Sequence, residues 1–379
     1  MTLQINIPAE AGDEEPAIYR DEETGKPITT QSMIKTFRAS PREAYYKYVL
    51  RLKPKSVSKP LRRGTWLHAL IEAYYTPGMD YEKVHEAYVS EFRKLFDEER
   101  MELGDMPTEI MQLFQSYIWH YGDPEYKDYS WTVHDTELKL TAEMPNGHLF
   151  RGVVDAVVED EFGLWLVDHK THKRLPDWNF RMMDEQSAMY IWAARQNDIP
   201  VHGFIWNYLT TEAISTPKVL KSGKTFYAKD FNSVNTDYPT FARAVKQAMK
   251  DYPDTFLKEP EEKQRVKERL AQLKAMRWSP DNQNGSPYFR RDVIEKTEGQ
   301  IQRVLKPFMR TSERMHGYDW SDPEAIEDSA DFVKGFTCNY RDLHISDLVS
   351  GDSSMLQRQN YTADEDPLSY QEKQVPGAN

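Results

Sequence analysis

The spacing of apolar residues along the chain changes from helical to strand-like near residue 131. Before that point apolar residues recur every three or four positions, which predicts amphipathic helices. The predicted helices span residues 32–50, 62–75, 81–103 and 107–121, with a break in the first near Pro41. In the second helix the apolar stripe consists of Leu67, Leu70, Ile71 and Tyr74.

From residue 131 the apolar positions alternate with polar ones, as they do in β-strands. Residues 131–144 and 149–160 are predicted strands, and the turn residues Pro145, Asn146 and Gly147 between them indicate a hairpin. Two further strands are predicted at residues 164–170 and 202–211, separated by a helix at 182–196. Three meandering strands, a crossover helix and another strand predict a compact α/β core.

The remaining segments suggest five regions along the chain. After the core, the pattern predicts a lysine-rich hairpin at residues 216–231, a charged helix at 259–276 and a long helix at 291–316. The expected regions are an acidic flexible arm (1–30), a helical N-terminal region with a basic patch (31–130), the core (131–215), a hairpin and helical C-terminal region (216–350) and a flexible tail (351–379).

Composition favours a protein of a reducing compartment. The 379-residue chain is 39% hydrophobic, which is enough for a sizeable core, and it holds one cysteine, Cys338, so no internal disulfide can form. The N-terminal sequence lacks the basic and apolar regions of a signal peptide, and no run approaches 18 apolar residues. We therefore expect a cytoplasmic protein with no membrane partner.

The net charge of −12 is unevenly distributed. Residues 1–26 hold seven acids and two bases, and residues 352–379 hold five acids and two bases. By contrast, residues 35–63 hold ten Lys and Arg against the single acid Glu43, with tyrosines among them. Cations bind phosphates and aromatic rings stack on bases, so this segment is a candidate nucleic-acid surface. The alternative is a solvated helical face.

Candidate chemistry lies on the second and third strands of the core. GVVD followed by D-x-K places Asp155 and Asp168 on neighbouring strands, with Lys170 on the same face as Asp168. Two adjacent carboxylates repel each other unless a cation lies between them, and hard oxygen ligands suit Mg²⁺ or Mn²⁺. A surface salt bridge on a hairpin is the alternative reading of these residues.

Further motifs flank this pair in a recognisable order. RRGTWLHALIE places His68 on a helix upstream, and Gln186 and Tyr190 share one face of the helix downstream. A glycine–histidine segment, then G-x-x-D, D-x-K and Q-x-x-x-Y resembles the PD-(D/E)XK nuclease superfamily. More narrowly, it resembles the RecB-like exonuclease branch, which includes many phage-encoded and CRISPR-associated nucleases. The resemblance covers about residues 32–345.

This resemblance implies an α/β, restriction-endonuclease-like fold: a mixed central sheet flanked by helices, with helical N- and C-terminal extensions. It implies an Mg²⁺- or Mn²⁺-dependent deoxyribonuclease, most simply an exonuclease of DNA recombination, replication or repair. Its metal ligands would be His68, Asp155, Asp168 and the carbonyl group of His169, and Lys170 would assist the attacking water. Gln186 and Tyr190 would contact DNA or order the site. The expected partner is DNA, and a recombination or single-strand-binding protein is a further candidate.

Several candidates carry less weight in this reading. The DNA-contacting cations of the basic segment would be Lys47, Arg51, Lys53 and Lys55. Glu137, on a strand beside the site, and Glu72, one turn after His68, are additional candidates that are more often solvated carboxylates. The sequence KSGKT at residues 221–225 resembles a phosphate-binding loop, but the residues around it favour a basic hairpin.

The ends of the chain depart from the family pattern. Many relatives bind an iron–sulfur cluster through four cysteines, whereas here Phe37 and Ser40 replace the tyrosine and cysteine of the first motif, and His344 ends the last. With Cys338 alone, no four-cysteine cluster is expected. The two ends are expected to pack together through apolar contacts instead. Two non-nuclease alternatives remain at this stage: a nuclease-fold protein that binds DNA ends or a recombination partner without cutting, and a scaffold protein.

Overall fold

The computed structural model describes residues 18–122, 131–174, 176–177, 179, 183–211, 214–232, 235–275, 288–328, 338–364 and 368. Its strands are β1 (Ile28–Thr30), β2 (Leu52–Pro54), β3 (Thr132–Glu143), β4 (Leu149–Asp160), β5 (Gly163–His172), β6 (Gly203–Thr210), β7 (Phe289–Glu295) and β8 (Tyr361–Ala363). The first helices are α1 (Gln31–Ala39), α2 (Pro41–Ala44), the π-helix η1 (Tyr45–Val49), α3 (Lys59–Tyr75), α4 (Tyr81–Lys94), α5 (Asp97–Leu103) and α6 (Met106–Tyr121). The others are α8 (Glu185–Gln196), α9 (Ala228–Asn232), α10 (Tyr238–Asp251), α11 (Pro260–Ala275), α12 (Glu298–His316), α14 (Arg341–Ser350) and α15 (Ser354–Asn360).

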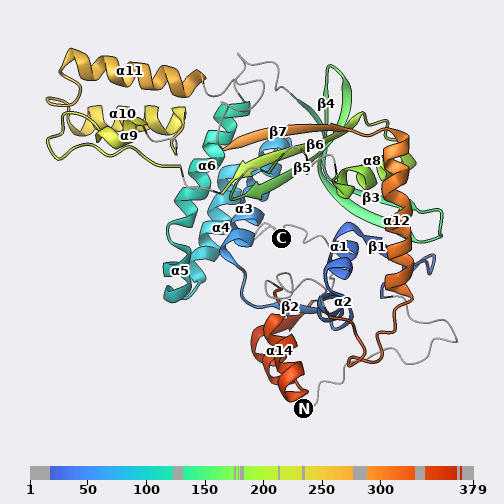
Figure 1. Ribbon diagram of the computed structural model, residues 1–379. Coiled ribbons are helices and arrows are strands. Elements are labelled where there is room, and N and C mark those ends of the chain that lie inside the picture. The colour runs from blue at the N-terminus through green and yellow to red at the C-terminus, as the bar shows by residue number, and fades with distance from the viewer. Residues whose placement is uncertain are drawn as a thin grey trace.

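A mixed six-stranded sheet forms the centre of the described part of the molecule (Figure 1). Its order is β1-β4-β5-β6-β7, and β3 pairs along the other edge of β4. The pairs β3–β4, β4–β5 and β6–β7 are antiparallel, whereas β1–β4 and β5–β6 are parallel. The crossover helix α8 connects the parallel neighbours β5 and β6. The expected α/β fold with a mixed central sheet flanked by helices is confirmed.

Helices cover the sheet on both sides. On one side α1, α8 and α12 pack against β3, β4 and β6 and contribute Phe37, Tyr190 and Phe308 to the largest apolar cluster. On the other side α3, α4 and α6 form a second cluster that reaches Leu209 of β6 and Phe289 of β7. Figure 1 shows these two sets of helices to the right and left of the sheet. None of the described helices is long and apolar enough to cross a membrane.

Two strands of the sheet differ from the sequence-based prediction. Ile28–Thr30, expected at the end of the acidic arm, form β1 and pair in parallel with Leu149 to Arg151 of β4. The predicted helix at residues 291–316 is wrong in its first turns, because Phe289–Glu295 form β7 and pair with β6. The helix α12 begins only after Thr297, whose side chain and that of Gln300 form a capping box.

The two ends of the described chain pack together, as expected. β2 and β8 form an antiparallel pair, and Tyr340 OH donates a hydrogen bond to Leu52 O at 2.7 Å. The rings of Tyr46 and Tyr340 stack with centroids 5.8 Å apart, and those of Tyr340 and Tyr361 at 5.6 Å. An aromatic cluster therefore joins η1 to the C-terminal helices, and residues 354–363 of the expected flexible tail form α15 and β8.

The lysine-rich segment after β6 forms a tight turn. Val219 and Phe226 make an antiparallel bridge, and Gly223 has a φ of 70° between them. Lys218, Lys221 and Lys224 are exposed on this turn. The turn and the helices α9, α10 and α11 share a small apolar core of their own, at the upper left of Figure 1. The basic-hairpin interpretation of KSGKT therefore agrees with the structure.

Candidate active site

Asp155 and Asp168 lie side by side on the central strands. The antiparallel ladder between β4 and β5 reaches Ala156 and Val167, and the two aspartates are the next residues on each strand. Both are buried, with 7% and 3% of their surface exposed. The backbone N–H of His169 donates to Asp155 Oδ2 at 2.6 Å, which fixes that carboxylate against β5.

Two side chains hold the carboxylate of Asp168. Lys170 Nζ lies 2.5 Å from Asp168 Oδ2, and Gln186 Nε2 donates to Asp168 Oδ1 at 2.7 Å. Lys170 lies two residues farther along β5, on the same face, and Gln186 is in the first turn of α8. The D-x-K and Q-x-x-x-Y motifs therefore meet at one carboxylate.

The charges of this site perturb one another. Burial raises the pKa of Asp168 above its usual value, against the lowering effect of Lys170, and the nearby Asp155 raises it further. Burial alone would lower the pKa of Lys170, but the carboxylates of Asp168 and Asp155 raise it above the usual range. The ammonium group of Lys170 is therefore held charged against two buried carboxylates.

The structure brings His68 to this pair from helix α3. Its Nδ1 lies 3.6 Å from Asp155 Oδ2, and its ring centroid is 5.8 Å from that of His169. The helix approaches β5 closely because Gly64 has no side chain: a Cβ there would lie 3.1 Å from Thr171 Oγ1. This close contact between α3 and β5 explains why the histidine motif has a glycine one turn before His68.

The side chain of His169 belongs to a polar network under the site that the sequence did not reveal. Asn207 Nδ2 lies 2.8 Å from His169 Nδ1 and donates to Tyr117 OH at 2.8 Å. The ring of Tyr75 is parallel to that of His169, with centroids 6.3 Å apart. Asn207 is fully buried in the strand GFIWNYLT, which is otherwise apolar up to its last residue, Thr210, and the amide in the middle of that strand was the available sequence signal.

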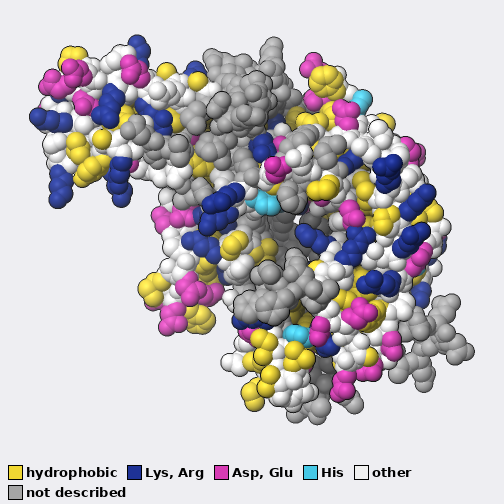
Figure 2. Space-filling model, in the orientation of Figure 1, with side chains coloured by type: hydrophobic (Ala, Val, Ile, Leu, Met, Phe, Trp, Pro, Cys, Tyr) yellow, Lys and Arg dark blue, Asp and Glu magenta, His cyan; other side chains and the backbone are white. Residues whose placement is uncertain are grey.

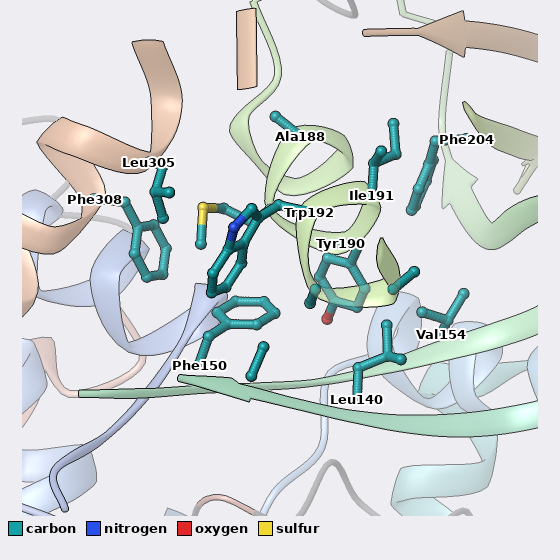
Figure 3. Close-up of a cluster of buried hydrophobic side chains, with 14 of the residues drawn as sticks. Leu140, Phe150, Val154, Ala188, Tyr190, Ile191, Trp192, Phe204, Leu305 and Phe308 are labelled. Carbon is teal, nitrogen blue, oxygen red and sulfur yellow. The ribbon is translucent and has the colours of Figure 1, made fainter. Parts of the chain in front are cut away.

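Tyr190 lies in the core and not on a DNA-facing surface. It is 2% exposed, and its ring meets that of Phe150 edge-on with centroids 5.7 Å apart. Figure 3 shows the two side chains near each other in the apolar cluster. A Cβ on Gly152 would lie 2.8 Å from the Tyr190 ring, so this tyrosine occupies the space that the glycine of G-x-x-D leaves. Of the two roles expected for Tyr190, ordering the site agrees better with this placement than contacting DNA.

The two additional carboxylates differ in their setting. Glu137 lies on β3 between Thr136 and Leu138, which pair with the residues on either side of Asp155. Its φ of 53° is uncommon for a residue other than glycine, and such strain is frequent near functional sites. Glu72 is half-buried one turn after His68 on α3.

The basic segment is partly used in internal contacts. Lys55 Nζ donates to Arg358 O at 2.8 Å and to Gln359 O at 2.9 Å. Lys47 Nζ lies 5.0 Å from the ring centroid of Tyr48, and Arg51 Cζ lies 5.3 Å from that of Tyr19. Lys53 is half-buried in β2. Other bases of the segment form ion pairs: Arg38 with Glu185, Arg42 with Asp328, Arg62 with Glu99 and Arg63 with Glu109.

The side chains at the site provide suitable donors for a divalent cation. Asp155 and Asp168 offer buried carboxylate oxygens and His68 an imidazole, which are ligands that Mg²⁺ and Mn²⁺ accept. Within the described ranges, however, no three His, Cys, Asp or Glu side chains are already arranged as a metal-binding group. The chemistry of these donor groups therefore suits such an ion. One of the carboxylate oxygens, Asp168 Oδ2, is bound by Lys170 in this structure.

Comparison with protein families agrees with this geometry. The family model of the PD-(D/E)XK nuclease superfamily matches residues 29–289, which include both aspartates, Lys170, His68 and Gln186. No curated protein matches the sequence. A solved structure from Eubacterium rectale, described as a "Putative exonuclease", is 12% identical and has a TM-score of 0.41, covering 86% of this chain and 94% of its own. The structure of SSO0001 is 15% identical with a TM-score of 0.18, covering 47% of this chain and 89% of its own.

Since the family model spans well over half of the 379 residues, the chain belongs to the PD-(D/E)XK nuclease superfamily.

Proposed function

We propose that the protein is a metal-dependent deoxyribonuclease that hydrolyses phosphodiester bonds, and that it works from DNA ends as an exonuclease of the RecB-like branch. The observation that carries the proposal is the meeting of Lys170 and Gln186 at Asp168, beside Asp155. A binding protein that does not cut has no need of two buried like charges held next to a lysine.

Each residue has a distinct task in this proposal. Asp155, Asp168 and His68 would hold Mg²⁺ or Mn²⁺, and the carbonyl group of His169 would be a further ligand. Such an ion polarises a phosphate and lowers the pKa of a bound water molecule. The ammonium group of Lys170 would stabilise the charge that develops on the attacked phosphate. Gln186 would keep Asp168 in one orientation.

DNA would reach the site over positively charged side chains, because the chain as a whole is acidic. Figure 2 shows Lys and Arg side chains on both sides of a hollow near the middle of the visible face. Lys47, Arg51 and Lys53 are candidates for phosphate contacts, whereas the ammonium group of Lys55 already binds two carbonyl groups. The lysines of the turn, Lys218, Lys221 and Lys224, form a second candidate surface.

The biological setting rests on the resemblance in motif order. DNA recombination, replication or repair, a phage origin and a recombination or single-strand-binding partner all follow from that resemblance, and each remains a prediction. The cytoplasmic location is also a prediction, and it rests on the single cysteine, Cys338, and on the absence of a long apolar run. No iron–sulfur cluster is expected, because Cys338 is the only cysteine in the chain. A silent nuclease-fold protein that binds DNA ends is the competing possibility.

The test uses end-labelled single- and double-stranded DNA, with a closed circle of the same sequence as the matched substrate. We expect release of labelled nucleotides from the linear forms in Mg²⁺ or Mn²⁺, none in EDTA, and an uncut circle. Cutting of the circle would replace the exonuclease proposal with an endonuclease. Binding of DNA ends without cutting in either metal would support the silent protein instead.

A further inference from the structure

The face of the sheet that carries Lys170 holds a second cation two strands away. Lys170 of β5 is registered with Tyr208 of β6, and Tyr208 is registered with Arg290 of β7. Registered neighbours in a sheet project from the same face, and strands lie about 4.8 Å apart. Arg290 therefore lies roughly 10 Å from Lys170 on the same face of the sheet.

Arg290 is held in place by a buried acid. Its Nε lies 2.7 Å from Asp292 Oδ1, and its Nη2 donates to Asp292 Oδ2 at 2.7 Å and to Pro176 O at 2.5 Å. Asp292 is 4% exposed, whereas the Arg290 side chain keeps 17% of its surface accessible. The carboxylate thus fixes one edge of the guanidinium group, while part of the side chain remains exposed.

The Arg290–Asp292 pair repeats the arrangement of Lys170 and Asp168. Asp168 is registered with Trp206 and Trp206 with Asp292, so each acid lies two residues from its cation on the same face. Lys170 Nζ lies 5.4 Å from the Trp206 ring and Arg290 Cζ lies 5.6 Å from the Tyr208 ring. These two rings stack with centroids 6.3 Å apart, so both cations lie on one aromatic platform.

This setting differs from that of a purely structural ion pair. A buried pair contributes little net stability compared with apolar residues of the same size, so stability alone is a weak reason for an Arg–Asp pair here. Two edges of a guanidinium can bind two groups at once, and Nη1 of Arg290 has no hydrogen-bond partner in the described part of the chain. That nitrogen belongs to a side chain on the same face as Lys170 that keeps 17% of its surface accessible.

We propose that Arg290 binds the DNA phosphate next to the one that is cut and so positions the strand over Asp168 and Lys170. This role rests on the proposed nuclease function. A charge-assisted hydrogen bond from a fixed guanidinium suits a phosphate oxygen, and Asp292 keeps the fork in one orientation. Arg290 is thus a substrate-binding residue that acts at a single position of the strand.

The test couples a protein change to a DNA change. The variant Arg290→Met with Asp292→Asn removes both charges at similar volume, so no buried acid is left unpaired. The DNA set replaces one phosphate at a time, on either side of the cut, with an uncharged methylphosphonate. Affinity is measured in Ca²⁺ and single-turnover cleavage in Mg²⁺, with thermal unfolding to confirm the fold.

We expect the wild type to lose affinity roughly ten- to hundredfold at one position beside the cut, which corresponds to one hydrogen bond to a charged group. The double variant should bind unmodified DNA more weakly by the same factor and lose nothing further at that position. If the double variant unfolds, Arg290→Lys is used instead. Lysine keeps the positive charge but lacks the forked guanidinium group, so the methylphosphonate at that position should reduce DNA affinity less than it does in the wild type.

The matched control is Arg195→Met with Glu298→Gln. Arg195 also lies against an acid and donates to a backbone carbonyl group, but it lies in the last turn of α8, at the opposite end from Gln186. The control variant should lose as much affinity as the wild type when the phosphate beside the cut is replaced. Folded Arg290 variants that show the full wild-type loss at every phosphate would overturn the role of Arg290. A wild type that neither binds nor cuts DNA would overturn the proposed function, and the role of Arg290 with it.

Discussion

The hydroxyl end of Tyr190 lies over Gly152, so closely that a Cβ on the glycine would be 2.8 Å from Tyr190 OH. The glycine of one motif and the tyrosine of another thus fill a single space between β4 and α8. Gly152→Ala should force the ring to move and destabilise the fold by about 1–3 kcal/mol. Urea unfolding measures this change.

The same change should be relieved by Tyr190→Leu, which shortens the side chain that meets Gly152. If Gly152→Ala is equally destabilising in the presence and absence of the Tyr190 ring, the contact does not explain the glycine.

Gln186→Ala should slow cleavage without preventing DNA binding. The amide holds Asp168 Oδ1 at 2.7 Å. If Asp168 is a metal ligand as proposed, loss of the group that orients it should cost roughly ten- to hundredfold in rate. Gln186→Glu should be slower still, because it places another carboxylate beside Asp168. Steady-state kinetics would show a lower kcat with little change in KM; a rise in KM alone would assign Gln186 to DNA contact.

Stability should fall in mild acid because of His316. Burial and, to a smaller extent, the nearby His148 together lower the pKa of His316 to about 4. The folded protein therefore keeps this ring neutral while the unfolded chain takes up a proton below about pH 6.5. Stability is fully present above that pH and is lost as the pH falls towards 4, by up to about 3 kcal/mol.

Urea unfolding of the wild type and of His316→Gln between pH 7 and 4 checks this expectation. The variant should lose most of the pH dependence, and some should remain because burial also lowers the pKa of His148. Parallel pH profiles for the two proteins would show that His316 titrates normally in the fold.

Replacing Lys47, Arg51 and Lys53 with Ser should weaken binding to all DNA sequences alike. Each lost phosphate contact reduces the slope of log affinity against log salt by about 0.9. The control replaces Lys263, Lys267 and Lys274, which are exposed on α11, and so removes the same charge elsewhere. Equal effects of the two triple variants would indicate a general charge effect and leave the turn with Lys218, Lys221 and Lys224 as the surface to test.

The sequence predicted those parts of the molecule that depend on local patterns. Alternation along β3, β4 and β5 placed Asp155 and Asp168 on adjacent strands, and the order of motifs added His68 and Gln186, which contact them. What the sequence could not provide was long-range pairing. The three residues of β1 pair with β4, more than 100 residues later, and so short a strand has almost no pattern of its own.

The misread start of α12 has a similar cause. The charged residues Arg290, Arg291 and Asp292 obscure the alternation of β7. Because a true helix, α12, follows shortly after them, the predicted helix was placed too early in the chain. Asn207 and Tyr190 were placed correctly in elements, but their burial depends on helices that pack from elsewhere in the chain. Tertiary packing, and not local preference, decides whether such residues face DNA or the core.

The central claim is that DNA is cut at the site of Asp168 and Lys170, and the single-turnover cleavage rate of matched variants in Mn²⁺ tests it most directly. Asp168→Asn and Lys170→Met keep the side-chain volume and remove one charge each, while Arg195→Met provides a control outside the site. We predict that both site variants fold, bind DNA and lose about a hundred- to a thousandfold in rate, as expected when charge stabilisation at a reacting phosphate is removed. Folded variants that cut DNA at the wild-type rate would contradict the account.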